Sequence, residues 1–170
     1  MRSLLRSLFL VLAMLTATWA AAQPGRVYKS LDEVTDPGEV YILRLRGKHL
    51  KAVPSEVFAM TNLRELDLRG NRLTSLPDSI ALLRHLERLE ASRNPLSALP
   101  NEMSQMSQLR ELILWDTYVA DLPATFELLD ATLEVLDLRS CRMSPDEQEA
   151  IAKMLPSVKK LWDNACNCGY

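Results

Sequence analysis

The sequence has few aromatic residues and no excess of charge of one sign. Aromatic residues make up 6% of the chain, whereas hydrophobic residues make up 48%, so leucine carries most of the apolar content. The 20 basic residues nearly balance the 22 acidic residues, which gives a formal net charge of −2. A chain without a strong basic field is poorly suited to binding a nucleic-acid backbone or an anionic membrane surface. We therefore expect no nucleic-acid partner.

Residues that bind metals are also scarce. The chain has three cysteines, Cys141, Cys166 and Cys168, and two histidines, His49 and His85. A C-x-C pair with one distant cysteine does not supply the four ligands of a usual zinc site, and the two histidines stand in different segments. We expect no metal site and no cofactor.

The first 22 residues have the pattern of an export signal. Arg2 and Arg6 precede an apolar stretch, and the three alanines at positions 20–22 supply small residues for cleavage before Gln23. The apolar stretch is short for a membrane span of ~20 residues, although a retained anchor is the alternative. We expect residues 1–22 to be removed, which leaves an exported chain, periplasmic or extracellular, without a stable membrane span.

The strongest pattern in the sequence is an internal repeat. The unit from Leu63 to Leu83 reads L-x-x-L-x-L-x-x-N-x-L-x-x-L-P-x-x-I-x-x-L. The other units begin at Val40, Leu86, Leu109 and Leu133. The five starting points are spaced 23, 23, 23 and 24 residues apart. Self-similarity at a fixed period of this length predicts a solenoid, in which stacked units share one core.

Each position of the unit has an expected structural role. The L-x-x-L-x-L segment predicts a short strand whose leucines face inward, while the residues between them face the concave side. The residue at the ninth position is expected to bond backbone groups at the bend, which would otherwise be buried and unpaired. Asparagine occupies this ninth position only in the middle units of the chain. The structural ladder that we expect consists of Asn71, Asn94, Thr117 and Cys141.

This pattern resembles the leucine-rich-repeat family, in particular the 23-residue class with a Leu-Pro pair found in Ras-suppressor-like proteins and in many exported bacterial proteins. The resemblance covers residues 40–143 and implies an α/β solenoid, with a curved parallel sheet of about five repeats and helical caps at both ends. Residues 23–39 would form the N-terminal cap, and residues 144–170 would form a C-terminal helix and cap. The resemblance implies binding of another macromolecule rather than catalysis, but it names no partner.

The two ends of the repeat read as caps. Residues 30–34 predict a short capping helix, and residues 36–38 predict the turn into the first repeat strand. Ser144 followed by Pro145 predicts the start of a helix after the last unit, because serine is a favoured N-cap and proline a favoured first helical residue. Pro156 is expected to end that helix.

A truncated sixth strand is expected after this helix, at Val158 and Leu161. Aligning these two residues with the first two leucines of the fifth unit places Cys166 one layer above Cys141. In an oxidising compartment that stacking permits a Cys141–Cys166 disulfide, in which case Cys168 has no disulfide partner within the chain. The alternative is that Cys141 is a buried structural thiol.

The concave face carries the candidate binding residues. Ile113 and Trp115 occupy neighbouring outward positions of one strand, whereas the rest of the face has mixed charge. Tryptophan and arginine are enriched at binding hot spots. The predicted partner-binding residues are Trp115, Ile113, Arg139, Arg69, Glu90 and Arg93. The alternative is that Trp115 packs along the sheet. The acids of this face are interleaved with arginines, so we expect no catalytic carboxylate pair.

Taken together, these patterns predict a non-enzymatic exported module that recognises a protein or peptide partner on its concave face. Two alternatives stay open: a structural or self-assembling cell-envelope protein, and a cytoplasmic Ras-suppressor-like adaptor if residues 1–22 are not an export signal. The oligomeric state in solution separates the first alternative from a binding module, and cleavage of the signal separates the second. The sequence leaves the partner and the oligomeric state open.

Overall fold

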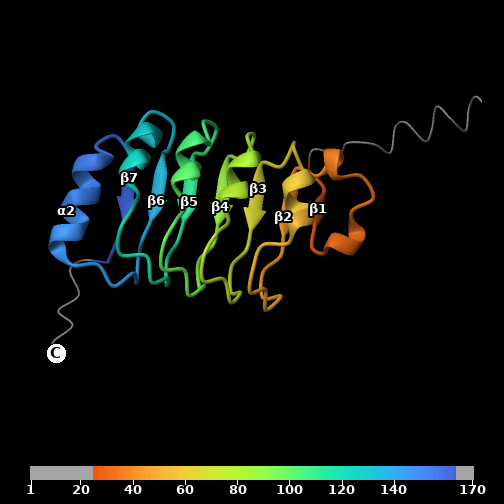
Figure 1. Cartoon of the computed structure of the whole chain (residues 1–170), viewed down its shortest axis with the longest axis horizontal. Helices are drawn as coiled ribbons and strands as arrows, with labels where there is room; N and C mark the ends of the chain where they lie inside the picture. The colour runs from red at the N-terminus through yellow and green to blue at the C-terminus, as the bar shows by residue number, and fades with distance from the viewer. Residues whose placement is uncertain (1–24, 164–170) are drawn as a thin grey trace, which may run out of the picture.

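The computed structural model describes residues 25–163, which form one open sheet of seven parallel strands (Figure 1). The strands follow one another across the sheet in chain order, so each repeat packs between its two neighbours. They are β1 (Val27–Tyr28), β2 (Ile42–Arg44), β3 (Glu65–Asp67), β4 (Arg88–Glu90), β5 (Glu111–Ile113), β6 (Val135–Asp137) and β7 (Lys159–Leu161). This is the solenoid that the repeat predicts.

Short 3-10 helices return the chain along the opposite side of the sheet. They are η1 (Leu31–Glu33), η2 (Pro37–Glu39), η3 (Ser55–Ala59), η4 (Asp78–Leu82), η5 (Asn101–Gln105) and η6 (Ala124–Leu129), and the α-helix α2 (Pro145–Met154) follows β6. Each helix from η3 to η6 begins directly after the proline of the Leu-Pro or Val-Pro pair. Proline suits this position because it fixes φ and has no N–H that would be left without an acceptor.

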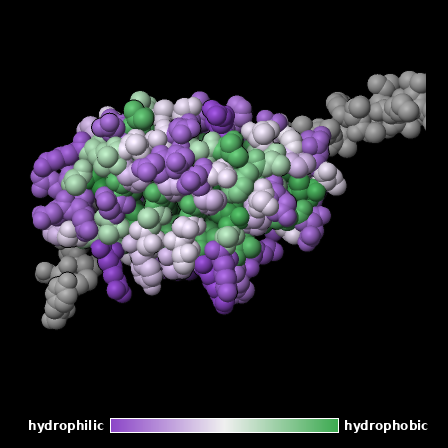
Figure 2. Space-filling view, in the orientation of Figure 1, coloured by the Kyte–Doolittle hydropathy of each residue, from purple (hydrophilic) through white to green (hydrophobic). Residues whose placement is uncertain are grey.

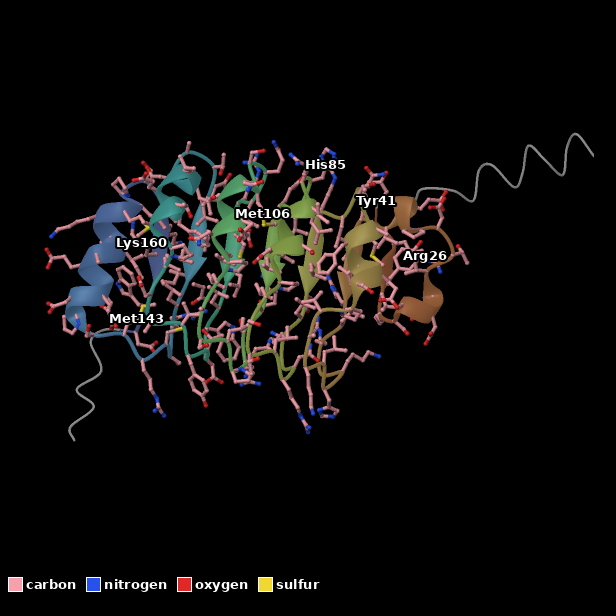
Figure 3. All side chains as sticks on the ribbon, in the orientation of Figure 1. Arg26, Tyr41, His85, Met106, Met143 and Lys160 are labelled. Carbon is pink, nitrogen blue, oxygen red and sulfur yellow. The ribbon has the colours of Figure 1, made fainter. Side chains whose placement is uncertain are left out.

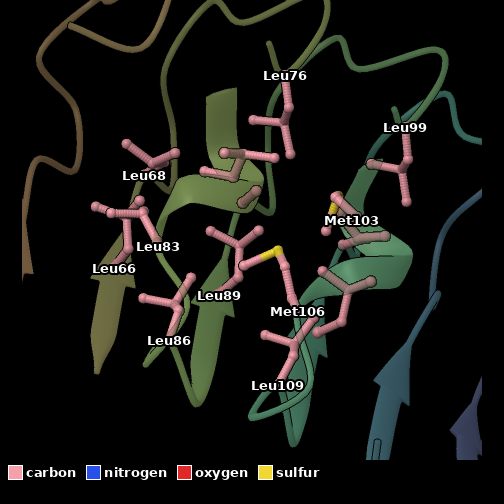
Figure 4. Close-up of a cluster of buried hydrophobic side chains, with 14 of the residues drawn as sticks. Leu66, Leu68, Leu76, Leu83, Leu86, Leu89, Leu99, Met103, Met106 and Leu109 are labelled. Atoms are coloured by element: carbon pink, nitrogen blue, oxygen red, sulfur yellow. The ribbon is translucent and has the colours of Figure 1, made fainter. Parts of the chain in front are cut away.

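Leucines form the core between the strands and the 3-10 helices. Leu66 of β3 pairs with Leu89 of β4, which in turn pairs with Leu112 of β5, so identical side chains stack from layer to layer. None of the three is more than 1% exposed. Figure 4 shows Met106, from the end of η5, among these leucines. A single repeat cannot enclose its own apolar side, so the layers stabilise one another.

The N-terminal cap contains a strand that the sequence does not predict. β1 pairs with β2, and Tyr28 is buried against the first layer of the core. A strand of two residues is too short to show an alternating pattern in the sequence. Residues 30–34, expected to form a capping helix, contain the single 3-10 turn η1, in which the Ser30 hydroxyl accepts a hydrogen bond from the Asp32 N–H at 3.3 Å.

Helix α2 begins with a capping box at the residues that the sequence indicates. The Ser144 hydroxyl accepts a hydrogen bond from the Glu147 N–H at 3.3 Å, and the Glu147 carboxylate accepts one from the Ser144 N–H at 2.6 Å. Pro145 stands at the first helical position. Ile151 and Leu155 are buried, so this helix covers the last layers of the core on the return side.

We expect Glu147→Ala to lower the free energy of unfolding by about 0.5–1 kcal/mol at neutral pH, because it removes half of the capping box. The hydrogen bond from the Ser144 backbone lowers the pKa of the Glu147 carboxyl. A lowered pKa in the folded state stabilises the fold above the ordinary carboxyl pKa, and this stabilisation is lost as the pH falls through the folded-state value. Urea unfolding of both proteins at neutral and acidic pH tests this.

The difference between wild type and Glu147→Ala should therefore shrink in acid. Glu149→Ala is the matched control, because Glu149 forms only an exposed ion pair with Lys153, at 2.6 Å, on the same helix. Such pairs contribute little to stability. Equal losses for the two variants would show that the capping box does not contribute specifically.

The sixth repeat strand exists as β7, but its register differs by one residue from the expected alignment. Leu136 pairs with Lys160, and Asp137 pairs with Leu161. Lys160, labelled on β7 in Figure 3, therefore takes the position that leucines hold in earlier strands. Its ammonium group donates a hydrogen bond to the carbonyl oxygen of Leu155 at the end of α2. A lysine suits the C-terminus of a helix, and this contact explains the shifted register.

Candidate protein-binding surface

The residues of the concave face lie in columns that run across the strands, because the register is continuous from β2 to β7. We call the first set the central column: Arg44, Asp67, Glu90, Ile113, Asp137 and Leu161. The second set, two residues further along each strand, is the rim column: Arg46, Arg69, Ser92, Trp115, Arg139 and Asp163. In Figure 2 apolar patches are interleaved with hydrophilic side chains on the side in view, so that side is not one continuous apolar surface.

The acids of the central column support the backbone at the bend. The carboxylates of Asp67, Glu90 and Asp137 each accept a hydrogen bond from the N–H two residues further on, at 3.0, 3.2 and 3.2 Å. Glu90 and Asp137 are buried. Hydrogen bonds from a side chain to its own local backbone are typical of turns. This arrangement gives the acids a structural role.

Arginines cover these acids. Arg46 pairs with Asp67 at 3.1 Å, and Arg139 pairs with Asp137 at 2.6 Å. The side chains of the two arginines are 49% and 52% exposed, whereas those of the two acids are 15% and 4% exposed. The hydrogen bond and the charge of Asp137 raise the pKa of Arg139. The charge that a partner would meet at these pairs is therefore the guanidinium group.

The predicted pair Ile113 and Trp115 differs from the expectation in one respect. Both lie on the concave face, but Ile113 is only 7% exposed, whereas Trp115 is half-buried. Ile113 stands in the central column between Glu90 and Asp137, which are themselves buried, so its neighbours cover it. Trp115 is thus the apolar side chain of the pair that a partner can reach.

Arg93 and Trp115 form a stacked pair. The Arg93 guanidinium carbon lies 4.6 Å from the centroid of the Trp115 ring, within the range of a cation–π interaction. Arg93 has a φ of +53°, in the left-handed region that side chains other than glycine rarely adopt. The equivalent positions of the other repeats are Gly47, Gly70, Asp116 and Ser140, with φ between 57° and 68°.

Two of these equivalent residues have local reasons to tolerate a positive φ. Aspartate adopts it more easily than most side chains, and the Ser140 N–H and hydroxyl both donate to the Asp163 carboxylate. The Arg93 N–H donates to the carbonyl oxygen of Trp115 at 3.0 Å, as the N–H groups of Gly47, Gly70 and Asp116 do to the next layer, and the Arg93 guanidinium group stacks on the Trp115 ring. A residue other than glycine in a strained backbone conformation is often found at functional sites.

The two ladder asparagines satisfy backbone groups of their own repeat and of the previous one. The Asn71 amide nitrogen donates to the carbonyl oxygens of Leu45 and Leu68 at 2.8 and 2.6 Å, and its oxygen accepts from the Leu50 N–H at 3.1 Å. Asn94 makes the same kind of contacts one layer further on. The ladder therefore supports the strand ends that carry the rim column.

Thr117 and Cys141 continue the ladder with fewer bonds. The Thr117 hydroxyl donates to the Leu114 carbonyl at 2.8 Å, and the Cys141 sulfur lies 3.3 Å from the same oxygen and 3.4 Å from the Thr117 hydroxyl. Burial raises the pKa of the Cys141 thiol. Cys166 and Cys168 lie outside the described residues, so the Cys141–Cys166 disulfide stays a prediction, although the alignment behind it is displaced by one residue in β7.

We expect the Cys141 thiol to react slowly with iodoacetamide in the folded protein. The thiolate is the reactive form, and a raised pKa leaves little of it at neutral pH. Peptide mapping after alkylation, with and without denaturant and reductant, measures this. Labelling after denaturation alone identifies a thiol, whereas labelling that also requires reductant identifies a disulfide. Cys141 is half-buried rather than fully buried, and rapid labelling of the folded protein would contradict the shielding of its thiol.

The family model for "Leucine-rich repeat region" matches residues 28–165. The chain belongs to the leucine-rich-repeat family. Among solved structures, it is similar to internalin C2 from Listeria monocytogenes, with a TM-score of 0.64 at 18% identity over 79% of this chain and 57% of that one. It is also similar to a leucine-rich-repeat protein of Leptospira interrogans, with a TM-score of 0.52 at 22% identity over 82% of this chain and 48% of that one.

These likenesses support the leucine-rich-repeat fold and no finer property. The chain spans about half the length of the two solved structures. No curated protein sequence matches it. A leucine-rich-repeat fold is typical of protein-interaction modules, and function in such folds depends on the residues placed on them. Between residues 25 and 163, no helix has the length and apolar character needed to cross a membrane.

Proposed function

We propose that this leucine-rich-repeat chain is a non-enzymatic exported module that binds a protein or peptide partner on its concave face. The observation that carries the proposal is the stacked pair of Arg93 and Trp115. A half-exposed tryptophan in the rim column is held by an arginine whose own backbone is in a left-handed conformation. Folding alone does not require this arrangement, because Gly47 and Gly70 form the same bend without it.

The pair has the properties of a binding anchor. Tryptophan and arginine dominate the energetics of many protein interfaces, because they bury a large area at low cost in conformational entropy. Cation–π stacking restricts both side chains before the partner arrives, which lowers the entropy lost on binding. The ladder and the recessed acids hold the strand ends beneath them. The anchor thus stands on a rigid part of the scaffold.

Capture of partners by the immobilised protein tests this function. The partners that the wild-type protein retains, identified by mass spectrometry, should be lost with Trp115→Ala and kept with Leu128→Ala. Leu128 is a suitable control, because it is 66% exposed on η6, on the opposite side of the sheet. Retention of the same partners by both variants would contradict a concave-face site. Loss of self-association with Trp115→Ala would instead favour a self-assembling role.

The export part of the proposal rests on the pattern of residues 1–22, which lie outside the described residues. We expect the native protein to begin at or near Gln23, because the small residues before it suit a signal peptidase. Intact mass or N-terminal sequencing of the protein from its own cells measures this. A soluble protein that retains Met1 inside the cell would contradict export and favour a cytoplasmic adaptor.

A further inference from the structure

Positively and negatively charged side chains are unevenly distributed over the concave face. Four arginines, Arg44, Arg46, Arg69 and Arg88, line one hollow of about 200 Å³ over β2 to β4, together with Glu65, Asp67 and Glu90. Arginines outnumber acids there by four to three, and Asp67 and Glu90 are the recessed acids that bond the backbone. The accessible charge of this half of the face is therefore cationic, in a chain whose formal net charge is −2.

One arginine of the hollow, Arg69, and the nearby Arg93 have no acidic partner. Arg44, Arg46 and Arg88 pair with acids of the face, whereas Arg69 and Arg93 form no ion pair with any other residue between 25 and 163. Arg69 is half-buried in the rim column, and Arg93 is exposed beside it, stacked on Trp115. Unpaired guanidinium groups are well suited to bind carboxylates through two parallel hydrogen bonds.

The other end of the face differs. Arg139 is neutralised by Asp137, and the exposed acids Asp116 and Asp163 lie near it. The unpaired arginines of the face therefore follow β3 and β4, and Trp115 follows β5. Lys159 of β7 is a separate exposed cation that also forms no ion pair between residues 25 and 163. Along the sheet from β2 to β5, a partner would therefore meet the arginines before it meets the aromatic side chain of Trp115.

We propose that the partner of this face is an extended acidic segment of a protein, with carboxylates on Arg69 and Arg93 and an apolar side chain on Trp115. This inference rests on the proposed function and deepens it. Strands lie ~4.8 Å apart, so the rim from β2 to β6 spans about 19 Å, and an extended chain that rises ~3.3 Å per residue covers it with about six residues. Residues 1–24 and 164–170, which lie outside the described residues, contain no aspartate or glutamate, so neither of these two segments supplies the acidic occupant.

A hexapeptide library tests the composition of this segment. Each blocked peptide carries one leucine or phenylalanine, with glutamate, glutamine or lysine at the other positions, and binding to the purified protein is measured by fluorescence anisotropy. We expect glutamate to be preferred over glutamine at the positions on one side of the apolar residue and lysine to be rejected. Affinity should also fall as salt is raised, because exposed charge pairs are screened.

Two arginine variants test which residues cause the preference for glutamate over glutamine. Arg69→Gln and Arg93→Gln should each weaken the best acidic peptide about tenfold, the effect of one lost charge-assisted contact, and should reduce the preference for glutamate over glutamine. Arg84→Gln is the control, because Arg84 is exposed in the turn before β4 and outside the rim column. Urea unfolding of each variant verifies that it is folded.

Three results would overturn the inference. If the best peptides are neutral or basic, or if none of the library binds, the partner is not an extended acidic segment, and the capture experiment decides the proposed function separately. If a DNA oligonucleotide of equal charge binds as tightly as the acidic peptide, the face attracts polyanions without peptide recognition. If the wild-type protein self-associates and Arg69→Gln abolishes this, the face is an interface between copies of the chain.

Discussion

Asn94→Ala is expected to lower the free energy of unfolding by about 3 kcal/mol. The Asn94 amide nitrogen donates to the carbonyl oxygens of Leu68, Ala91 and Ser92, and its oxygen accepts from the Leu73 N–H at 3.1 Å. Two of these carbonyls have other donors in reach: Leu68 accepts from Asn71, and Ser92 accepts from a backbone N–H. The variant therefore leaves mainly Leu73 and Ala91 unpaired, at ~1–3 kcal/mol for each buried group.

Asn94→Thr separates the contribution of the hydrogen bond to Ala91 from that of the hydrogen bond to Leu73. Thr117 shows what a threonine does at this position, since its hydroxyl donates to the carbonyl oxygen three residues earlier at 2.8 Å. Asn94→Thr should keep the equivalent bond to Ala91 and leave the Leu73 N–H unpaired, so about half of the loss is expected. Asn101→Ala, on an exposed residue, is the control. Urea midpoints measure all three. A midpoint unchanged by Asn94→Ala would mean that the ladder does not stabilise the stack.

The repeat could be predicted from the sequence because its spacing determines the register. A shift by one residue between neighbouring layers would turn leucines such as Leu66 and Leu89 outward, so only one register buries them. The capping box at Ser144 and Glu147 is similarly local, since both partners lie within one turn of the helix. Patterns of this kind specify contacts between residues whose separation is constant.

The last strand could not be predicted in the same way. Helix α2 interrupts the repeat before β7, and the apolar pattern favours Leu161 for the inward position. The structure instead places Lys160 there, because its ammonium group reaches the end of the helix. A contact between a strand and the helix before it has no fixed spacing. The burial of Ile113 is a similar case, since it depends on side chains from two other strands.

The stacking of Arg93 on Trp115 could be predicted only in part from the sequence. The sequence places both residues on the concave side of neighbouring repeats, and Arg93 stands where Gly47 and Gly70 stand in the first two units. An arginine at a position that elsewhere holds glycine indicates a bend with positive φ. The stacking itself follows from the direction in which that bend sends the side chain, which only the backbone geometry reveals.

Trp115→Ala is expected to weaken binding of the captured partner by about 2 kcal/mol, roughly 30-fold, because it removes a large aromatic anchor from the contact. The free energy of unfolding should change little. Trp115 is half-buried on the concave face, whereas the neighbouring Leu112 and Leu114 are fully buried in the core cluster, to which Trp115 does not belong. Titration of the partner and urea unfolding of the same preparations give the two quantities. Tyr118→Ala is the matched control, because Tyr118 is an aromatic residue of the same repeat and is 61% exposed.

Arg93→Gly makes the test sharper, because stability and affinity should move in opposite directions. Glycine adopts a φ of +53° without strain, which stabilises the folded state, but it also raises the chain entropy of the unfolded state. The free energy of unfolding should therefore be unchanged or rise by about 1 kcal/mol. Binding should weaken about tenfold, since the partner loses a charged contact and Trp115 loses the side chain that orders it. A fold made less stable by Arg93→Gly, or by Trp115→Ala with binding intact in the folded fraction, would assign the stacked pair to packing of the sheet. Stabilisation with loss of binding would instead mean that the strain at Arg93 is maintained for recognition.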